Sequence, residues 1–144
     1  MRVLVDTNVL LRVQNPEAPH HTLAKKALSA LRLRDESLCV AAQNLIEFWA
    51  VATCKVDENG LGLPIGAAAL EIQSLKRLFE VLPSSADAFS EWQRLVSEHA
   101  VIGKQTHDAH IAATMLVHDV THILTFNGKD FARFPGITVI DPNE

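Results

Sequence analysis

The segment Arg2-Val3-Leu4-Val5-Asp6 decides the fold, because it is a short apolar run that ends in an acid. Such a run is typical of a buried strand of a parallel sheet. Further short apolar runs predict four more strands, at residues 38–40, 81–82, 122–125 and 137–140. Apolar residues at helical spacing predict helices at residues 19–34, 43–54, 65–79, 87–99 and 107–119. Strands that alternate with helices predict an α/β fold with a mainly parallel sheet of about five strands.

The length and composition predict one globular domain over residues 1–144. Of the 144 residues, 48% are hydrophobic and 21% are charged, which excludes a disordered or fibrous protein. No apolar run approaches the ~20 residues of a membrane span, and Asp6 comes too early for the apolar region of a signal peptide. Cys39 and Cys54 make no disulfide framework, so we expect a reducing, cytoplasmic compartment.

Polar residues follow the first and the fourth predicted strand directly. Asp6 ends the first strand, whereas Thr125, Asn127 and Asp130 follow the fourth. Ligands of open α/β sheets bind beyond the carboxyl ends of the strands, so both groups are expected at one edge. Each group also has a simpler explanation, because Asp6 would serve as a helix cap and Asn127-Gly128 is a strong turn pair.

A further acid, Glu47, lies within the apolar segment Leu45-Ile46-Glu47-Phe48-Trp49-Ala50-Val51. A helix that is apolar nearly all round is expected to be buried. Burying a carboxylate costs several kcal/mol unless it is paired, hydrogen-bonded or bound to a metal. Glu47 is therefore either part of a structural ion pair, for example with an arginine, or a member of a site. Gln43, one turn earlier, would share its polar surroundings.

Asp108 extends the apolar stripe of the last predicted helix. Ile111, Ala112 and Met115 follow it at helical spacing, so Asp108 is expected to point toward the interior. An acid in the first turn also suits the helix dipole. That role alone does not require the core-facing side.

Convergence of Asp6, Glu47, Asp108 and Asp130 would require a cation. Two carboxylates ~4 Å apart repel each other by roughly 4 kcal/mol at an effective dielectric of 20. Ligands that are all oxygen favour Mg²⁺ or Mn²⁺ over zinc. Such an ion activates a water molecule and stabilises a phosphodiester during displacement.

Zinc is the alternative metal, because the chain has seven histidines. His107 and His110 lie three residues apart, and His118 and His122 follow. This spacing alone is a weak zinc signal, and no cysteine lies near it. The chain also lacks a Gly-x-Ser-x-Gly elbow and a phosphate-binding glycine pattern, which argues against a serine hydrolase and a nucleotide-binding fold.

In the order and spacing of its motifs, the chain resembles the PIN domain family, in its VapC-type toxin branch. The resemblance covers nearly the whole chain and rests on the ordered set rather than on one motif. The matching segments are Val5-Asp6-Thr7-Asn8-Val9-Leu10, Asn44-Leu45-Ile46-Glu47-Phe48, Gly60-Leu61-Gly62-Leu63, Thr106-His107-Asp108-Ala109-His110-Ile111-Ala112 and Ile123-Leu124-Thr125-Phe126-Asn127-Gly128-Lys129-Asp130-Phe131.

The resemblance implies a compact three-layer α/β/α sandwich around a parallel sheet. It also implies a ribonuclease that depends on Mg²⁺ or Mn²⁺, a small antitoxin that binds and inhibits it, and a homodimer. The positions that match the three core acids of the family are Asp6, Glu47 and Asp108. The positions that resemble supporting polar groups are Thr7, Asn8 and Thr125.

The fourth acid of the family falls within residues 125–130, where this chain departs from the usual pattern. Many members carry Asp at the position of Asn127. Either Asp130 takes that role, or Asn127 binds a metal-bound water or a phosphate through its amide. The family match therefore leaves the fourth ligand open between these two residues.

The resemblance and the acids together suggest hydrolysis of RNA by a metal-activated water. Asp6 and Asp108 would hold the ion, and Glu47 would complete the site or orient the attacking water. Asp130 or Asn127 would help a second, weaker metal. Two alternatives are a PIN-fold module that binds without catalysis, and a carboxylate–metal nuclease or phosphatase that acts on DNA or small phosphates.

The charge balance suits RNA binding at one place only. The net charge is -4, from 13 Lys and Arg against 17 Asp and Glu, which argues against a strongly basic nucleic-acid binder. Without the four converging acids, 13 acidic residues face 13 basic ones, so the remaining surface is formally neutral. The candidate phosphate contacts, each otherwise a solvated surface charge, are Arg12, Lys25, Lys26, Arg32, Arg34, Lys104 and Lys129.

The amphipathic helices offer candidate partner surfaces. The helices at residues 20–34 and 65–79 would pack a dimer or receive the antitoxin, although ordinary core packing explains their stripes equally well. In the helix at residues 87–99, Phe89, Trp92 and Val96 are expected to face inward.

Overall fold

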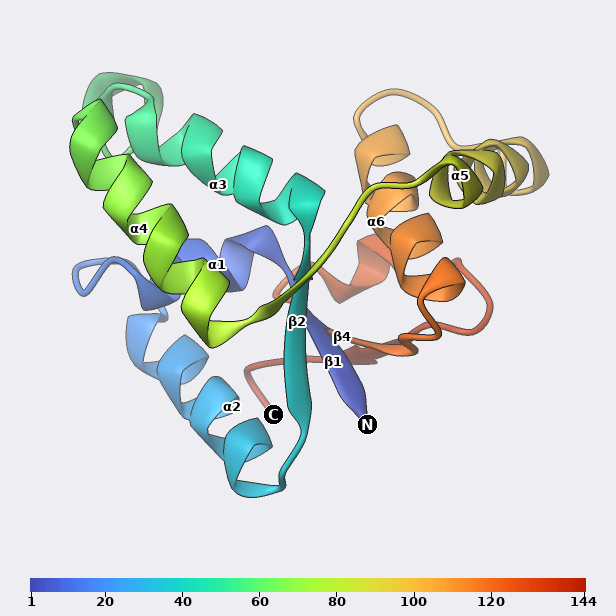
Figure 1. Ribbon diagram of the computed structural model, residues 1–144, viewed down its shortest axis with the longest axis horizontal. Helices are drawn as coiled ribbons and strands as arrows, with labels where there is room; N and C mark the ends of the chain where they lie inside the picture. The colour runs from blue at the N-terminus through green and yellow to red at the C-terminus, as the bar shows by residue number, and fades with distance from the viewer.

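Five parallel strands form the centre of the structure, a computed structural model that describes residues 1–144. The strands are β1 (Arg2–Val5), β2 (Ser37–Ala41), β3 (Glu80–Leu82), β4 (His122–Leu124) and β5 (Thr138–Ile140). The helices are α1 (Thr7–Val13), α2 (His21–Leu33), α3 (Ala42–Thr53), α4 (Ile65–Leu78), α5 (Ala86–Glu98) and α6 (Gln105–Val117), shown in Figure 1. Two short 3₁₀ helices, η1 (Val56–Glu58) and η2 (Gly128–Asp130), lie in loops.

The strand order β3-β2-β1-β4-β5 places β1 at the centre of the sheet. Leu4 pairs with Cys39 of β2 on one side and with Ile123 of β4 on the other. The chain builds β2 and β3 on one side of β1 and then returns to the other side for β4 and β5. The strand order therefore reverses between β1 and β4, which is where open α/β sheets bind ligands.

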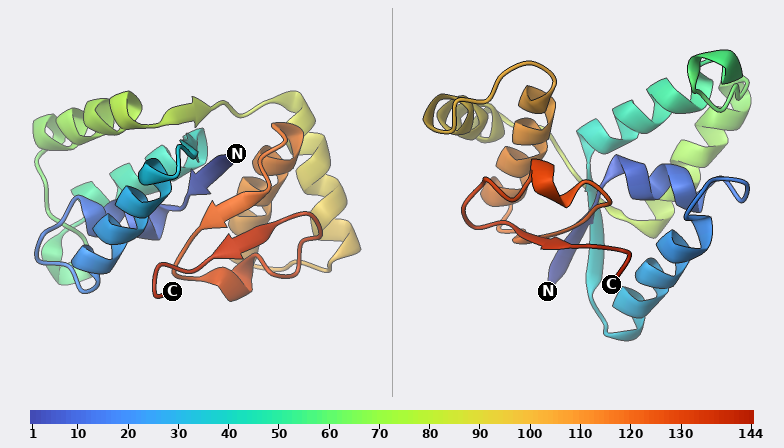
Figure 2. Two further views of the ribbon diagram at one scale, coloured as in Figure 1. Left: turned by 90° about the horizontal axis from the view of Figure 1, so that it is seen from below. Right: turned by 180° about the vertical axis from the view of Figure 1, so that it is seen from behind.

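Helices cover both faces of the sheet. Alternate residues of a strand point to opposite faces, and Val3 and Val5 accordingly pack in a core with residues of α1, α2, α3 and α4. Leu4, between them, packs with Ile111 and Met115 of α6. Figures 1 and 2 show α1–α4 on one side of the sheet and α5 and α6 on the other. The predicted three-layer α/β/α sandwich with a parallel sheet is confirmed.

The sequence pattern predicted all five strands and every α-helix except α1. The predicted strands and the five longer helices agree with the structure within about two residues at each end. Helix α1 has only seven residues, too short for a clear periodic pattern. Asp6 caps this helix by accepting a hydrogen bond from the backbone N–H of Thr7, so the cap explanation of Asp6 is also correct.

Two expectations about burial are wrong. Helix α3 is not buried all round, because the Ile46 side chain is 69% exposed. Phe89 of α5, expected to face inward, is 58% exposed and lies against Trp92 with ring centres 5.5 Å apart. The buried residues of α5 are Ala88 and Leu95 instead.

Two further findings concern membrane-spanning helices and the two cysteines. None of the helices combines the length and the apolar character that crossing a membrane requires. Cys39 and Cys54 are both free thiols, the first buried and the second partly exposed.

Candidate active site

Asp6 lies at the carboxyl end of β1, next to the end of β4. Its backbone N–H donates to the carbonyl oxygen of Leu124 at 3.0 Å, which joins the two strand ends. Its side chain is only 6% exposed, and four hydrogen bonds hold the carboxylate in one orientation. The donors are the Thr7 backbone N–H (2.8 Å), the Thr125 hydroxyl (2.8 Å), and the side-chain amides of Asn8 (3.3 Å) and Asn44 (3.3 Å).

Glu47 reaches the same region from α3. The Thr7 hydroxyl donates to Glu47 Oε1 at 2.7 Å, and the Gln43 amide donates to Glu47 Oε2 at 3.0 Å. No ion pair involves Glu47, so the structural ion pair considered for this residue is not formed. The predicted role of Gln43 as a polar neighbour of Glu47 is confirmed by the hydrogen bond.

Asn44 is a supporting residue that the sequence reasoning missed. It is fully buried, and its amide donates to Thr7 Oγ1 at 3.0 Å as well as to Asp6. Its side-chain oxygen accepts from the backbone N–H of Ala41 at 2.8 Å, which caps the start of α3. The available signal was a polar side chain in an otherwise apolar helix, because a fully buried amide needs several partners.

Asp108 and Asp130 approach the site from α6 and from η2. Neither carboxylate forms a hydrogen bond or an ion pair with the protein, although Asp108 is half-buried. Their proximity to the other acids is evident in the electrostatics, because the charges of Asp6, Asp130 and Glu47 all act on Asp108. The four predicted acids thus act on one another electrostatically around the end of β1, although no three of them are close enough together to hold a metal ion.

Burial and mutual repulsion raise the pKa values of two of these acids, which opposes full deprotonation of the group. Burial raises the pKa of Asp6 to about 6 against the hydrogen bonds from Thr125 and Thr7, and Glu47 and Asp130 raise it further. Burial raises the pKa of Asp108 to about 7, with a further contribution from the neighbouring acids. Perturbed carboxylates gathered at one edge are a common mark of a functional site.

The predicted supporting residues fall into two groups. Thr7 and Thr125 are buried, and Asn8 is partly buried; all three contact the acids directly. Asn8 also donates to Thr125 Oγ1 at 3.0 Å. Asn127 differs, because its side chain is exposed and only its backbone N–H contacts Thr125, at 3.0 Å.

The histidines have separate partners and do not form the zinc alternative. His110 Nδ1 lies 2.5 Å from Gln43 Oε1, whereas His118 Nε2 lies 3.4 Å from the Pro83 carbonyl and His122 Nδ1 lies 2.8 Å from Thr121 Oγ1. Burial lowers the pKa of His110, and His107 lowers it further. Gln43 of α3 contacts both His110 of α6 and Glu47, and so links His110 to the acidic site.

The donor set fits a hard divalent cation. All four candidate ligands offer carboxylate oxygens, which Mg²⁺ and Mn²⁺ prefer. In this conformation, no three His, Cys, Asp or Glu side chains are close enough together to hold a metal ion. Like charges keep uncompensated carboxylates apart. Asp108 and Asp130 have no protein partner that would prevent them from turning toward Asp6 and Glu47.

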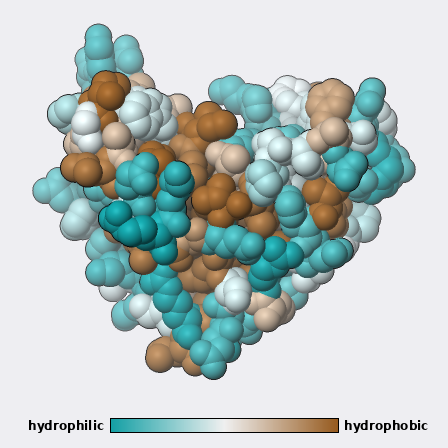
Figure 3. All heavy atoms as spheres, viewed as in Figure 1, coloured by the Kyte–Doolittle hydropathy of each residue, from teal (hydrophilic) through white to brown (hydrophobic).

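A groove beside the acids is lined partly by apolar side chains. It has a volume of about 350 Å³ and runs between the start of α3 and helices α5 and α6, with Gln43, Ile46, Phe89, Trp92, His107 and His110 among its lining residues. Figure 3 shows hydrophobic atoms along α3 and around the notch that separates it from α5. Gln43 and His110 connect this groove to Glu47.

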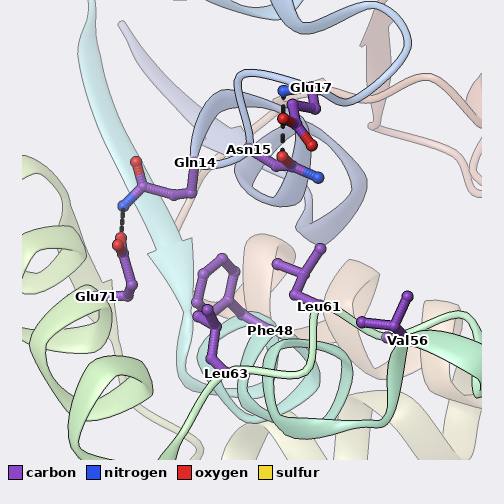
Figure 4. Close-up of a pocket in the computed structure, with 9 residues that line it drawn as sticks. Gln14, Asn15, Glu17, Phe48, Val56, Leu61, Leu63 and Glu71 are labelled. Carbon is purple, nitrogen blue, oxygen red and sulfur yellow. Dashed lines mark hydrogen bonds between the residues drawn. The ribbon is translucent and has the colours of Figure 1, made fainter.

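A separate cavity of about 290 Å³ lies away from the acids, between the end of α1, helix α3 and the loop before α4. Figure 4 shows Phe48, Leu61 and Leu63 on one side of it and Gln14 hydrogen-bonded to Glu71 on the other. None of the four acids lines this cavity. It is therefore not the candidate active site.

Comparisons with known proteins agree with this architecture. The family model for the PIN domain matches residues 3–137. No curated protein gives a significant match to the chain. Among solved structures, VapBC-1 from nontypeable Haemophilus influenzae has a TM-score of 0.73 at 18% identity, with all of both chains covered.

Two further solved structures share the fold. VapBC2 from Rickettsia felis, bound to a DNA fragment from its promoter, has a TM-score of 0.70 at 17% identity, with 98% of each chain covered. Mycobacterium tuberculosis VapC20, a Sarcin-Ricin loop cleaving toxin, has a TM-score of 0.69 at 18% identity; the match covers 90% of this chain and 93% of that one. At these identities the likeness shows the fold alone.

Proposed function

The chain belongs to the PIN domain family, and from that premise we propose that it is a metal-dependent endoribonuclease, the toxin of a toxin–antitoxin pair. The observation that carries the proposal is the arrangement of four acids around the end of β1: Thr7 donates to both Asp6 and Glu47, and the charges of Asp108 and Asp130 act within the same group. Four acids from four separate segments have no structural need to meet, because their repulsion opposes folding. A bound divalent cation would offset this repulsion and explain why the four acids lie in one place.

We propose that Asp6 and Asp108 hold the cation and that Glu47 completes the site. When bound, Mg²⁺ or Mn²⁺ makes a water molecule more acidic and offsets negative charge on the phosphate oxygens. Asp6 is suited to a fixed ligand, because Thr7, Asn8, Asn44 and Thr125 set its orientation. Asp108 is suited to a ligand that turns to meet the ion.

Glu47 is suited to orienting the attacking water. Thr7 and Gln43 each donate to one of its oxygens, so its carboxylate is held at the edge of the acid group. Attack of the water oxygen forms a new bond to phosphorus and breaks the bond from phosphorus to the leaving ribose oxygen. Glu47 would accept a proton from the water, and the leaving oxygen gains one from solvent.

For the fourth acid we propose Asp130 rather than Asn127. The charge of Asp130 acts on both Asp6 and Asp108. The side chain of Asn127 is exposed and has no partner among the acids. Asp130 would then serve the second, weaker metal position.

The proposed partners are RNA, a small antitoxin and a second copy of the chain, all in the cytoplasm. The comparison structures that are VapBC complexes support an antitoxin partner. The groove lined by Ile46, Phe89 and Trp92 supports it further, because these side chains are apolar and lie beside the acidic site. Exposed apolar surface of this kind marks protein interaction sites.

The proposal is tested by cleavage of RNA with Mg²⁺ or Mn²⁺ present. We expect cleavage by the wild type and a loss of at least about a hundredfold in D6N and in D108N, because each removes a charge aimed at the cation. D57N is the matched control, since Asp57 is an exposed acid in η1 with no contact to the site. Single-stranded DNA and a simple phosphomonoester serve as comparison substrates.

Full RNA cleavage by both folded variants would contradict the assignment of the acids. Cleavage of DNA or of the phosphomonoester in preference to RNA would favour the alternative metal hydrolase. Binding of RNA without any metal-dependent cleavage would favour a PIN-fold binding module.

A further inference from the structure

Arg12 and Phe126 form a stacked pair beside the acidic site. The central guanidinium carbon of Arg12 lies 4.5 Å from the centre of the Phe126 ring. Phe126 directly follows Thr125, which donates to Asp6, and the Phe126 backbone N–H donates to Asn8 Oδ1 at 3.1 Å. The aromatic ring under Arg12 is therefore fixed to the residues that orient the central acid.

The Arg12 side chain turns back along α1 toward the acids. Side chains of a helix tilt toward its N-terminus, and Arg12 Nη1 donates to the backbone oxygen of Asn8, one turn earlier, at 2.9 Å. The guanidinium thus lies over the first turn of α1, which Asp6 caps. Its contacts with Phe126 and Asn8 restrict its rotamers, so binding a ligand costs it less conformational entropy.

No carboxylate neutralises Arg12. The ion pairs of the structure involve Arg2, Arg94 and the N-terminal amine instead. One N–H group of the guanidinium donates to Asn8, and the remaining ones have no acceptor in the protein. A planar fork of free donors matches the oxygens of a phosphate, to which arginine binds in a bidentate manner.

Building on the ribonuclease function proposed above, we propose that Arg12, stacked on Phe126, binds a backbone phosphate of the RNA strand next to the phosphate that the acids hydrolyse. Such a contact carries no base specificity and fixes the register of the strand. Arg12 thereby stands apart from the other basic residues considered as phosphate contacts.

Arg32 provides a matched comparison within the chain. Its guanidinium carbon lies 5.7 Å from the Phe79 ring, so it too is an arginine stacked on phenylalanine. Phe79 directly precedes β3 and therefore lies near the amino ends of the strands, at the edge opposite the acids. An effect of stacking or of net charge alone would be equal in R12A and R32A.

The test measures binding of a fluorescein-labelled oligouridylate by anisotropy, with Ca²⁺ in place of Mg²⁺, over salt concentrations from about 50 to 200 mM. For R12A we expect about tenfold weaker binding, since a charged phosphate contact is lost. The slope of log K against log salt should fall by about 0.7, the value for one single-strand phosphate. R32A should keep the affinity and the slope of the wild type.

Two conservative variants separate charge from geometry. R12K should keep the salt slope, because its charge remains, but bind more weakly because lysine lacks the planar fork. R12Q, which keeps a polar side chain without the charge, should lower the salt slope by the same amount as R12A and serves if R12A does not fold. The Mn²⁺ affinity of all these variants should equal that of the wild type, since none of them changes an acid.

Equal affinity and equal salt slope in R12A and R32A would overturn the inference about Arg12. That result would leave the proposed function intact if D108N still lost RNA cleavage. Conversely, full cleavage by D6N and D108N would overturn the proposed function, whatever R12A does.

Discussion

Replacement of Asp108 by Asn should stabilise the protein at neutral pH when no divalent ion is present, although it should abolish cleavage. Burial raises the pKa of Asp108 from 3.8 to about 7, and the charges of Asp6, Asp130 and Glu47 raise it further. The folded state then binds the proton more tightly than the unfolded state. The contribution of Asp108 to stability is therefore greatest below pH 3.8 and falls as the pH rises toward 7. Asn does not ionise, so this loss of stability is absent from D108N.

The size of the effect follows from the pKa. A rise from 3.8 to about 7 corresponds to at most about 4 kcal/mol of unfolding free energy. Because Asp108 is only half-buried, solvent screens part of this, and we expect roughly 1–2 kcal/mol. Asp6 is almost fully buried, and its pKa of about 6 adds a decline of about 3 kcal/mol in the wild type as the pH rises from 4 to 7.

The assay is urea unfolding with a chelator present, at about pH 4 and about pH 7.5, for the wild type, D108N and the control D57N. D108N should be the more stable by roughly 1–2 kcal/mol at the higher pH and equal to the wild type at the lower one. Mn²⁺ at a hundred times the wild-type Kd should stabilise the wild type by about 2.7 kcal/mol and D108N by no more than about 1.4 kcal/mol, because D108N binds the ion at least about tenfold more weakly. A D108N protein less stable than the wild type at neutral pH without metal would refute the electrostatic reasoning.

Three further outcomes are expected. N44L should lower the unfolding free energy by about 2–3 kcal/mol in denaturation experiments, because it leaves buried hydrogen-bonding partners unsatisfied. Q43A should reduce kcat several-fold with little change in thermal stability, since it frees Glu47 but removes no buried group; a large drop in Tm would count against this. D130N should weaken Mn²⁺ binding in a calorimetric titration by about tenfold, whereas N127A should not; the reverse order would assign the fourth position to Asn127.

The strands and the acids were predictable because both leave local signals. A short apolar run such as Val3-Leu4-Val5 specifies a buried parallel strand, and an acid at its end is placed at the ligand-binding edge by the sheet itself. Asp108 was predictable from helical periodicity, because it extends a stripe whose other members are buried. These inferences need only the period of each element.

The supporting contacts were not predictable because they join segments far apart in the chain. The bond from Thr125 to Asp6 spans 119 positions and depends on β4 lying beside β1. In the sequence, Asn44 is an ordinary polar residue; its contacts with Asp6 and Thr7 arise only because α3 packs against the end of β1. Arg12 likewise gains its neighbour Phe126 only from the strand order.

The exposure of some apolar residues could not be predicted from the sequence either. Periodicity identifies an apolar stripe but not what covers it, so Phe89 and Ile46 were expected inside and lie outside. Both line the groove beside the acids. Their exposure is consistent with the proposed protein partner, since large exposed apolar side chains that share one groove are uncommon without a binding role.

The most direct test of the central claim is a titration of the metal-free protein with Mn²⁺, followed by the electron paramagnetic resonance of the free ion. If the four acids form a cation site, the wild type and D57N will remove Mn²⁺ from solution with at least one equivalent of tight binding. D6N and D108N, shown to be folded by circular dichroism, will bind it at least about tenfold more weakly, a loss of about 1.4 kcal/mol. Equal Mn²⁺ binding by all four proteins, or none by the wild type, would contradict the account.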